Sequence, residues 1–299
     1  MEPSGPTGTL PQMPPAPDIP GPVTAEDLMS QLTPGTMSAP PPGAVSAALA
    51  AASAPPAVPE MESAGDMCVE LPAGLIDGES LITSASVREL TGYDEEALSH
   101  LDETANYGKY VTKMLELGVD ELGGARPTLE QLRDLLIGDR DALILGIRRA
   151  TYGRDFKFDM TCPSCERVSN VVIDLIDDIP VNKLDDPYKR VFEVPDTRRR
   201  IKVKLLDGAA QEAFSEGIAK KTGPEVDTVT LAQSVIEIDG NPTGRREDPV
   251  LKLSAHDRQK VLEFLGEHTP GPQTMGIPVE CATCHKEYPY SVGLGSLFR

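Results

Sequence analysis

The sequence predicts an α+β protein in which a mainly helical lobe is followed by a small-sheet lobe and preceded by a disordered arm. Two Cys-x-x-Cys turns, at residues 162–165 and 281–284, each lie between short segments of alternating polarity. Apolar residues repeat at helical spacing elsewhere in the chain. We therefore expect an arm over residues 1–66, a mainly helical lobe over 67–155 and an α+β lobe over 156–299.

The arm is predicted from composition alone. Fifteen of the 28 prolines fall within the first 60 residues, and this stretch has no aromatic residue. Such a segment cannot bury enough apolar surface to offset the entropy that ordering removes. Two short pieces, 24–32 and 45–54, are apolar enough to become ordered on a protein partner.

The helical lobe begins with two extended segments, 69–76 and 79–90, and continues with helices. One helix starts near Asp94, and a second apolar stripe covers 107–118, where Gly118 ends it. These segments have the spacing of core residues, so we interpret their tyrosines and methionines as core.

The clearest helical pair follows. Thr128 and Gln131 form a capping box that starts a helix, and we expect Gly138 to end it and Asp139 to cap the next. Charged residues are frequent in that second helix, and we interpret them as solvated helix ends. They are Asp139, Arg140, Asp141, Arg148 and Arg149.

A metal site is predicted from the two Cys-x-x-Cys turns. In the first, alternating Phe156, Phe158 and Met160 form a strand that leads into the turn, and 168–175 form the returning strand. The second turn also lies between short strand-like segments. A Cys-x-x-Cys turn delivers two thiolates to one metal ion, and two such turns complete the tetrahedral sulfur shell that Zn²⁺ prefers. The predicted zinc ligands are Cys162, Cys165, Cys281 and Cys284.

The predicted zinc site is a structural one. Four sulfurs leave no open coordination position for substrate or water. His285 directly follows Cys284 and is the alternative ligand, although the four sulfurs suffice without it. The 115 residues between Cys165 and Cys281 must leave the site and return to it, so the site is split across the chain.

Within this excursion we expect a hairpin over 190–206, a helix from Asp207, a turn at 239–242 and a long helix that Ser254 caps. The hairpin contains the basic run 198–204. No aromatic residues lie within this run, so the pattern gives weak support to nucleic-acid binding.

Composition limits the function. The chain has 28 Lys and Arg against 47 Asp and Glu, a net charge of −19, which argues against nucleic acid and anionic membranes as partners. Four of five cysteines belong to the turns, and we interpret Cys68 as a half-buried apolar residue. No catalytic motif appears, and the four histidines lack metal or triad spacing. We therefore expect a protein that is not an enzyme and is cytoplasmic when synthesised.

Several short motifs occur in an order that is similar to a known family. They are Leu-Leu-x-Gly-Asp-Arg-x-x-Leu at 135–143, Ile147-Arg148, Tyr152-Gly153, Cys162-Pro163-Ser164-Cys165, Ile238-Asp239-Gly240 and Cys281-Ala282-Thr283-Cys284. With the apolar end at Phe298, this order resembles the baseplate hub assembly family of contractile-tailed bacteriophages. That family has relatives in phage-derived contractile injection systems, and the resemblance covers about residues 70–299.

The resemblance implies a baseplate structural protein or assembly chaperone. Such a protein binds hub, wedge or tail-tube proteins and is incorporated into a virion tail or an injection-system baseplate. Two alternatives remain open at this point. A zinc-ribbon protein that binds nucleic acid would use the basic run 198–204, and a metal- or thiol-dependent enzyme would need an open zinc position or a reactive thiol.

Overall fold

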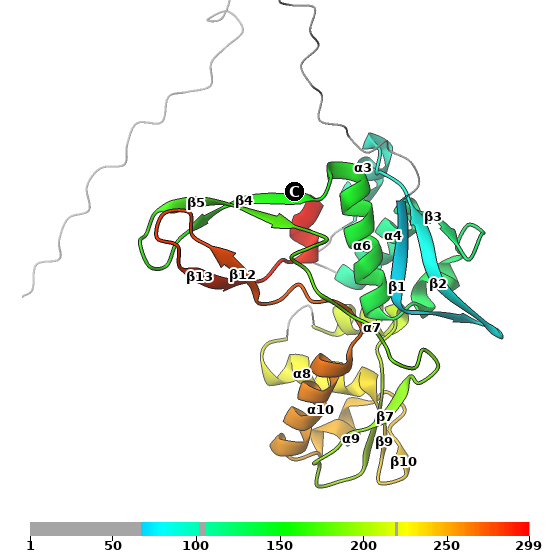
Figure 1. The fold of residues 1–299 in the computed structure, drawn as a ribbon. Coiled ribbons are helices and arrows are strands. Elements are labelled where there is room, and N and C mark those ends of the chain that lie inside the picture. The colour runs from blue at the N-terminus through cyan, green and yellow to red at the C-terminus, as the bar shows by residue number, and fades with distance from the viewer. Residues whose placement is uncertain (1–66, 102–105, 219–220, 299) are drawn as a thin grey trace, which may run out of the picture. The chain divides into compact units, whose positions relative to one another are not determined.

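The computed structural model describes residues 67–101, 106–218 and 221–298, so the predicted arm lies outside the described residues. Its helices are α3 (Gly92–Ser99), α4 (Tyr107–Gly118), α5 (Leu129–Asp134), α6 (Ile137–Tyr152), α7 (Gly208–Ile218), α8 (Pro224–Ser234), α9 (Glu247–Leu251), α10 (Ala255–His268) and the 3-10 helix η1 (Leu294–Phe298) (Figure 1). Its strands are β1 (Met67–Asp77), β2 (Ser80–Val87), β3 (Val119–Leu122), β4 (Asp155–Thr161), β5 (Val168–Asp174), β6 (Val181–Asn182), β7 (Val191–Glu193), β8 (Ile201–Lys204), β9 (Val235–Ile238), β10 (Asn241–Pro242), β11 (Gly271–Pro272), β12 (Ile277–Glu280) and β13 (Glu287–Tyr290).

The strands form several small antiparallel sheets. One sheet has the order β1-β2-β3 and another the order β10-β9-β8-β7. Three pairs stand alone as two-stranded sheets, namely β4 with β5, β12 with β13, and β6 with β11. Small antiparallel sheets combined with helices confirm the predicted α+β class.

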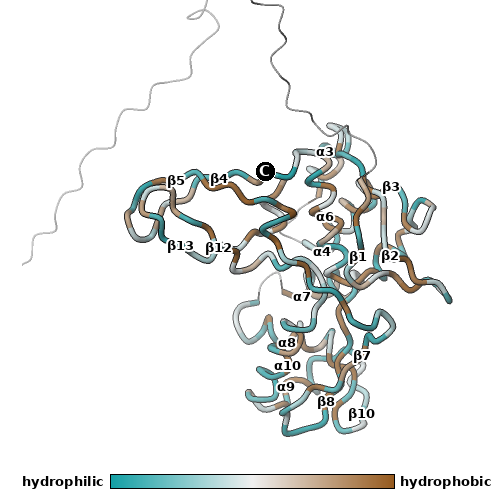
Figure 2. The backbone as a smooth tube through the Cα atoms, viewed as in Figure 1, coloured by the Kyte–Doolittle hydropathy of each residue, from teal (hydrophilic) through white to brown (hydrophobic). Residues whose placement is uncertain are grey.

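The larger core surrounds α6. This helix packs on β1 and β2 and also contacts α4 and η1, and Figure 2 shows its apolar residues in brown. Buried Leu143 and Ile147 of α6 belong to one cluster with Phe156 of β4, Ile277 of β12 and Leu297 of η1. The core therefore takes residues from both sides of the predicted boundary at residue 155, and the apolar C-terminal segment packs as expected.

A second core lies in the excursion between the two cysteine turns. Ile201 and Val203 of β8 pack with Leu231 of α8 and with Val261 and Phe264 of α10. The elements agree with the expected hairpin and helices. This core consists of residues between positions 194 and 265.

The helix boundary near residue 138 differs from the expectation. Gly138 lies in the first turn of α6 and does not end α5, and Asp139 lies inside α6 and does not cap it. The backbone of Gly138 lies directly against Pro270 and Gly271, where a side chain has no room. Glycine is therefore required here by a close approach of two backbones and not by a helix end.

The interpretation of the charged residues of α6 as solvated is wrong for three of them. Asp139 and Arg140 are 0% exposed and Arg148 is 8% exposed. Asp139 Oδ1 accepts the backbone N–H groups of Ala73 at 2.8 Å and Gly74 at 3.3 Å, which anchors β1 to the start of α6. Burial raises the pKa of Asp139, because the charged form loses hydration.

The contact at Gly138 predicts opposite effects for two glycine-to-alanine substitutions. In Gly138→Ala the new Cβ overlaps the carbonyl oxygen of Pro270, so we expect a loss of about 3 kcal/mol of unfolding free energy. Gly266→Ala in α10 meets open space and should stabilise the protein by up to about 1 kcal/mol. Denaturant unfolding measures both, and equal effects would contradict the close approach.

Candidate metal centre

The first cysteine turn closes the hairpin of β4 and β5. These strands pair without a bulge from Asp155–Asp174 to Thr161–Val168. Beyond them, the N–H of Cys162 donates to Arg167 O at 2.9 Å and the N–H of Glu166 donates to Cys162 O at 2.9 Å. Glu166 has a φ of 58°, a left-handed conformation that turns the chain back into β5.

The second turn has the same local structure at the end of β12 and β13. The N–H of Cys281 donates to Lys286 O at 3.0 Å, and the N–H of His285 donates to Cys281 O at 2.9 Å. His285 has a φ of 56°, which matches the first turn. The two turns are therefore a structural repeat, in agreement with the recurrence of the sequence motif.

Contacts between the two hairpins bring the turns together. The rings of Phe158 on β4 and Tyr290 on β13 stack with centroids 4.2 Å apart. Closer to the cysteines, the N–H of Ala282 donates to Ser169 Oγ at 3.0 Å. In Figure 1 the two hairpins, green and red, lie next to each other. This packing joins segments that are more than a hundred residues apart in the sequence.

The four predicted ligands converge on one point. Their sulfur atoms all lie within 4.8 Å of one another. Cys162 Sγ is 3.6 Å from Cys284 Sγ, and Cys165 Sγ is 3.8 Å from Cys281 Sγ. A tetrahedral ion with metal–sulfur distances of about 2.3 Å requires sulfur–sulfur edges of about 3.8 Å. The cluster therefore fits a metal site.

The close packing of the thiols also changes their protonation. Burial raises the pKa of Cys162, but backbone N–H groups in its turn and the Tyr288 hydroxyl, 3.7 Å away, lower that pKa to about 6. The backbone N–H of Lys286 lowers the pKa of Cys284, whereas burial and the neighbouring thiols raise it to about 11. The thiol of Cys284 is therefore protonated at neutral pH unless a cation stabilises its thiolate.

His285, the alternative ligand, contacts a neighbouring carboxylate. His285 Nδ1 lies 2.6 Å from Glu280 Oε1, which occupies this ring nitrogen. Tyr288 and Ser169 support the turns through the contacts given above. The sequence does not identify these two residues, because a hydroxyl group on a strand has no distinctive spacing. Among the described residues, no second cluster of three or more His, Cys, Asp or Glu side chains could hold a metal ion.

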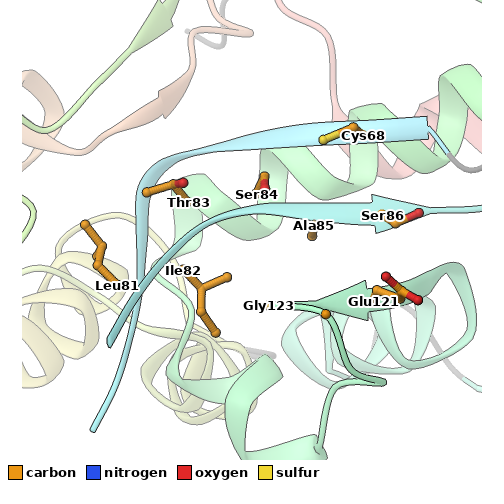
Figure 3. Close-up of a pocket in the computed structure, with 10 residues that line it drawn as sticks. Cys68, Leu81, Ile82, Thr83, Ser84, Ala85, Ser86, Glu121 and Gly123 are labelled. Atoms are coloured by element: carbon orange, nitrogen blue, oxygen red, sulfur yellow. The ribbon is translucent and has the colours of Figure 1, made fainter. Parts of the chain in front are cut away.

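A surface groove beside β2 and β3 is a second candidate site (Figure 3). Ser84, Ser86, Glu121 and Cys68 are among its lining residues. Cys68 is exposed, so its interpretation as a half-buried apolar residue is wrong. Among the described residues that line the groove there is no histidine or basic side chain that could activate a serine or cysteine as a nucleophile.

The family assignment agrees with these features. The family model described as T4 bacteriophage base plate protein matches residues 79–299, which include both cysteine turns, the second core and most of the larger core. The chain belongs to this family. It matches no curated protein and no solved structure. The resemblance to a phage baseplate family that the motif order indicated is therefore confirmed.

Another motif of this baseplate chain, the Gly-Asp-Arg segment, forms a buried polar centre. Arg140 donates to Leu132 O at 2.6 Å, Gly108 O at 3.2 Å, Thr112 Oγ1 at 2.7 Å and Gln211 Oε1 at 2.8 Å. Burial lowers the pKa of Arg140 to about 10, which leaves its guanidinium charged at neutral pH. The side chain joins α4, α5 and α7 at one point, so this motif stabilises the fold.

The family places the chain in a phage tail. Every helix among residues 67–101, 106–218 and 221–298 is too short or too polar to span a bilayer. The baseplate family is structural, and its members are parts of a protein assembly. Protein partners within the baseplate follow from this membership.

Proposed function

We propose that the protein is a non-enzymatic structural or assembly component of a contractile tail or injection-system baseplate that binds hub or wedge proteins. The observation that carries the proposal is the family match over residues 79–299. The four-sulfur cluster supports it, because a closed sulfur shell stabilises a fold and offers no position for a reacting group.

The metal in the proposed function is structural Zn²⁺, with Cys162, Cys165, Cys281 and Cys284 as ligands. Thiolate sulfur in a tetrahedral arrangement is the ligand set that Zn²⁺ selects. The ion would hold the two hairpins together beside the stacked rings of Phe158 and Tyr290. In this proposal the lobe over 156–299 is clamped by the metal, the lobe over 67–155 is mainly helical, and the arm over 1–66 becomes ordered on a baseplate partner.

Nucleic-acid binding is not favoured by the basic run. Arg199 pairs with Asp239 at 2.7 Å, Lys202 with Glu237 at 2.9 Å and Lys204 with Asp207 at 2.5 Å. These acidic neighbours neutralise much of the positive charge that phosphate contacts would need. The alternative zinc-ribbon function therefore gains no support from this surface.

Quantitative mass spectrometry of purified tails tests the proposal. A fixed number of copies relative to the tube protein in mature particles would identify a structural part. Presence in assembly intermediates alone would identify a chaperone. Absence from both would overturn the proposal. As a matched pair of variants, we expect the Cys68→Ser protein to be incorporated into tails normally and the Cys162→Ser protein to be absent from them.

Zinc binding should release protons. Because the pKa of Cys284 is raised to about 11, its thiol is protonated at pH 7 and must lose its proton when the ion binds. Affinity should therefore fall as pH is lowered. Calorimetry of zinc binding to the metal-free chain, in two buffers with different ionisation enthalpies, measures the protons released. Binding without proton release would contradict thiolate ligation.

A further inference from the structure

Strand β5 has one paired side and one open side. It pairs with β4 along its whole length and with no other strand among the described residues. Hydrogen bonds at the two ends of this ladder show which residues of β5 point their backbone N–H and C=O groups toward β4. The N–H of Cys162 donates to Arg167 O, and the N–H of Leu175 donates to Arg154 O. Bonded and non-bonded pairs alternate between these two ends of an antiparallel ladder.

This alternation assigns the peptide groups on the open side. The N–H and C=O groups of Val168, Asn170 and Val172 point away from β4. Asp174 is the next residue in the same position, and its N–H donates to Asp178 Oδ2 at 2.8 Å. The edge is therefore closed by a side chain at one end, while three residues before it have backbone groups available to another strand.

The other strands of the two hairpins carry features that prevent edge pairing. β4 has the exposed charges Asp155, Lys157 and Asp159, and β12 and β13 contain Pro278 and Pro289. Charges and prolines are the usual protection of a free edge against another strand. The first six residues of β5 contain neither.

The exposed face of β5 also carries apolar side chains. Val168 is 66% exposed and Val172 is 49% exposed. Asn170, between them on the same face, is also exposed. An uncharged edge with exposed valines is the feature that native proteins either protect or pair.

The geometry points to a second copy of this chain as the occupant, with β5 of each copy paired antiparallel across a two-fold axis at Asn170. In this register Asn170 lies opposite Asn170 of the second copy, and Val168 lies opposite the second copy's Val172. Each outward-facing residue meets another outward-facing residue, so three pairs exchange about six hydrogen bonds. The two hairpins become one four-stranded sheet.

The symmetry of the open edge favours a second copy over a different protein, because Val168, Asn170 and Val172 have the same order in either direction along the strand. The chain carries a net charge of −19, which opposes contact between the charged surfaces of two copies. The edge of β5 is neutral over Val168–Ile173, and the acidic Asp174 beyond it is already paired with Arg154, so like copies can meet there without strong repulsion. A heterologous partner attracted by the acidic surface would need a basic segment, for which this edge offers no complementary charge. The same residues match each other across a two-fold axis, as an isologous interface requires.

Matched proline variants of the full-length, zinc-loaded chain test the use of this edge. Asn170→Pro removes a peptide N–H that points to the open side and keeps the ladder with β4. Asp159→Pro makes the same change on the cross-strand partner, and both variants lose the hydrogen bond from Asn170 Nδ2 to Asp159 Oδ1. In sedimentation velocity over a concentration series, we expect Asn170→Pro to weaken the dimer about tenfold or more and Asp159→Pro to leave it unchanged.

Charge variants test the register. Val168→Lys and Val172→Glu should each weaken the dimer, because each places a charge opposite a valine. The double variant should restore it, because the new lysine of each copy then faces the new glutamate of the other copy. Zinc content and melting temperature verify that each variant is folded.

Three outcomes would overturn the assignment. One is a wild-type chain that remains monomeric throughout the concentration series. The second is a dimer that persists in both Asn170→Pro and Val172→Glu. The third is a double charge variant that is no tighter than the single variants, which would exclude this register. The dimer test needs no tail proteins, so its failure would leave the baseplate role unaffected.

Discussion

Cys162→Ser is expected to abolish tight metal binding and to unfold the two hairpins that carry the cysteine turns. Cys162 is 0% exposed and belongs to the four-sulfur cluster, so serine replaces a soft thiolate with a poor zinc ligand. Structural zinc contributes on the order of 10 kcal/mol to folding. Metal analysis of the purified protein should show loss of zinc, and thermal unfolding should show an early transition.

The matched control is Cys68→Ser. Cys68 is exposed on β1 and lies outside the cluster, so this variant should keep its zinc and its melting temperature. A strong chelator added to the wild-type protein should reproduce the Cys162→Ser transition. If Cys162→Ser were soluble and melted normally, the metal would not be a structural element of this fold.

Arg140→Met is expected to lower the unfolding free energy by about 3 to 5 kcal/mol. Methionine fills a similar volume but donates no hydrogen bond. The acceptors on Leu132, Gly108, Thr112 and Gln211 would then lose their buried donor. A buried polar group without a partner retains the full cost of its lost hydration. Urea unfolding followed by circular dichroism measures the loss.

Two further substitutions separate the role of Arg140 from general effects. Arg126 is exposed, so Arg126→Met should change stability by less than about 0.5 kcal/mol. Arg140→Lys keeps the charge but lacks the planar fork of donors, so it should also destabilise the protein. A fully stable Arg140→Lys variant would show that the charge alone is sufficient at this position.

The elements that the sequence predicts best are those whose signals are local. Alternation at Phe156 and Phe158 indicates a strand, and Thr128 with Gln131 indicates a helix start; the structure has both. The cysteine turns are found for the same reason, because the two thiolates that one Cys-x-x-Cys turn supplies are only three residues apart in the chain. Their convergence requires only the assumption that one ion needs four sulfurs.

Features that depend on distant neighbours escape the sequence pattern. Gly138 has the local signal of a helix end, but its contact with Pro270 lies 132 residues further along the chain. Asp139 and Arg140 have the local signal of solvated residues, because helical position does not reveal that β1, α4 and α7 cover this turn. Composition alone does not predict whether Cys68 is buried, because its exposure depends on which face of β1 is covered by α6.

The separation of the two cysteine pairs in the sequence affects the order in which the site can form during translation. Because 115 residues separate the two pairs of cysteines, the second pair leaves the ribosome roughly 6 to 23 seconds after the first at ordinary rates of translation. During this time the first pair is an open half-site with free thiols. The core over 194–265 is synthesised within the same interval and can form before the sulfur cluster closes. We therefore expect nascent chains to pass through a stage in which the core over 194–265 is complete while Cys162 and Cys165 have not yet met the second pair of cysteines.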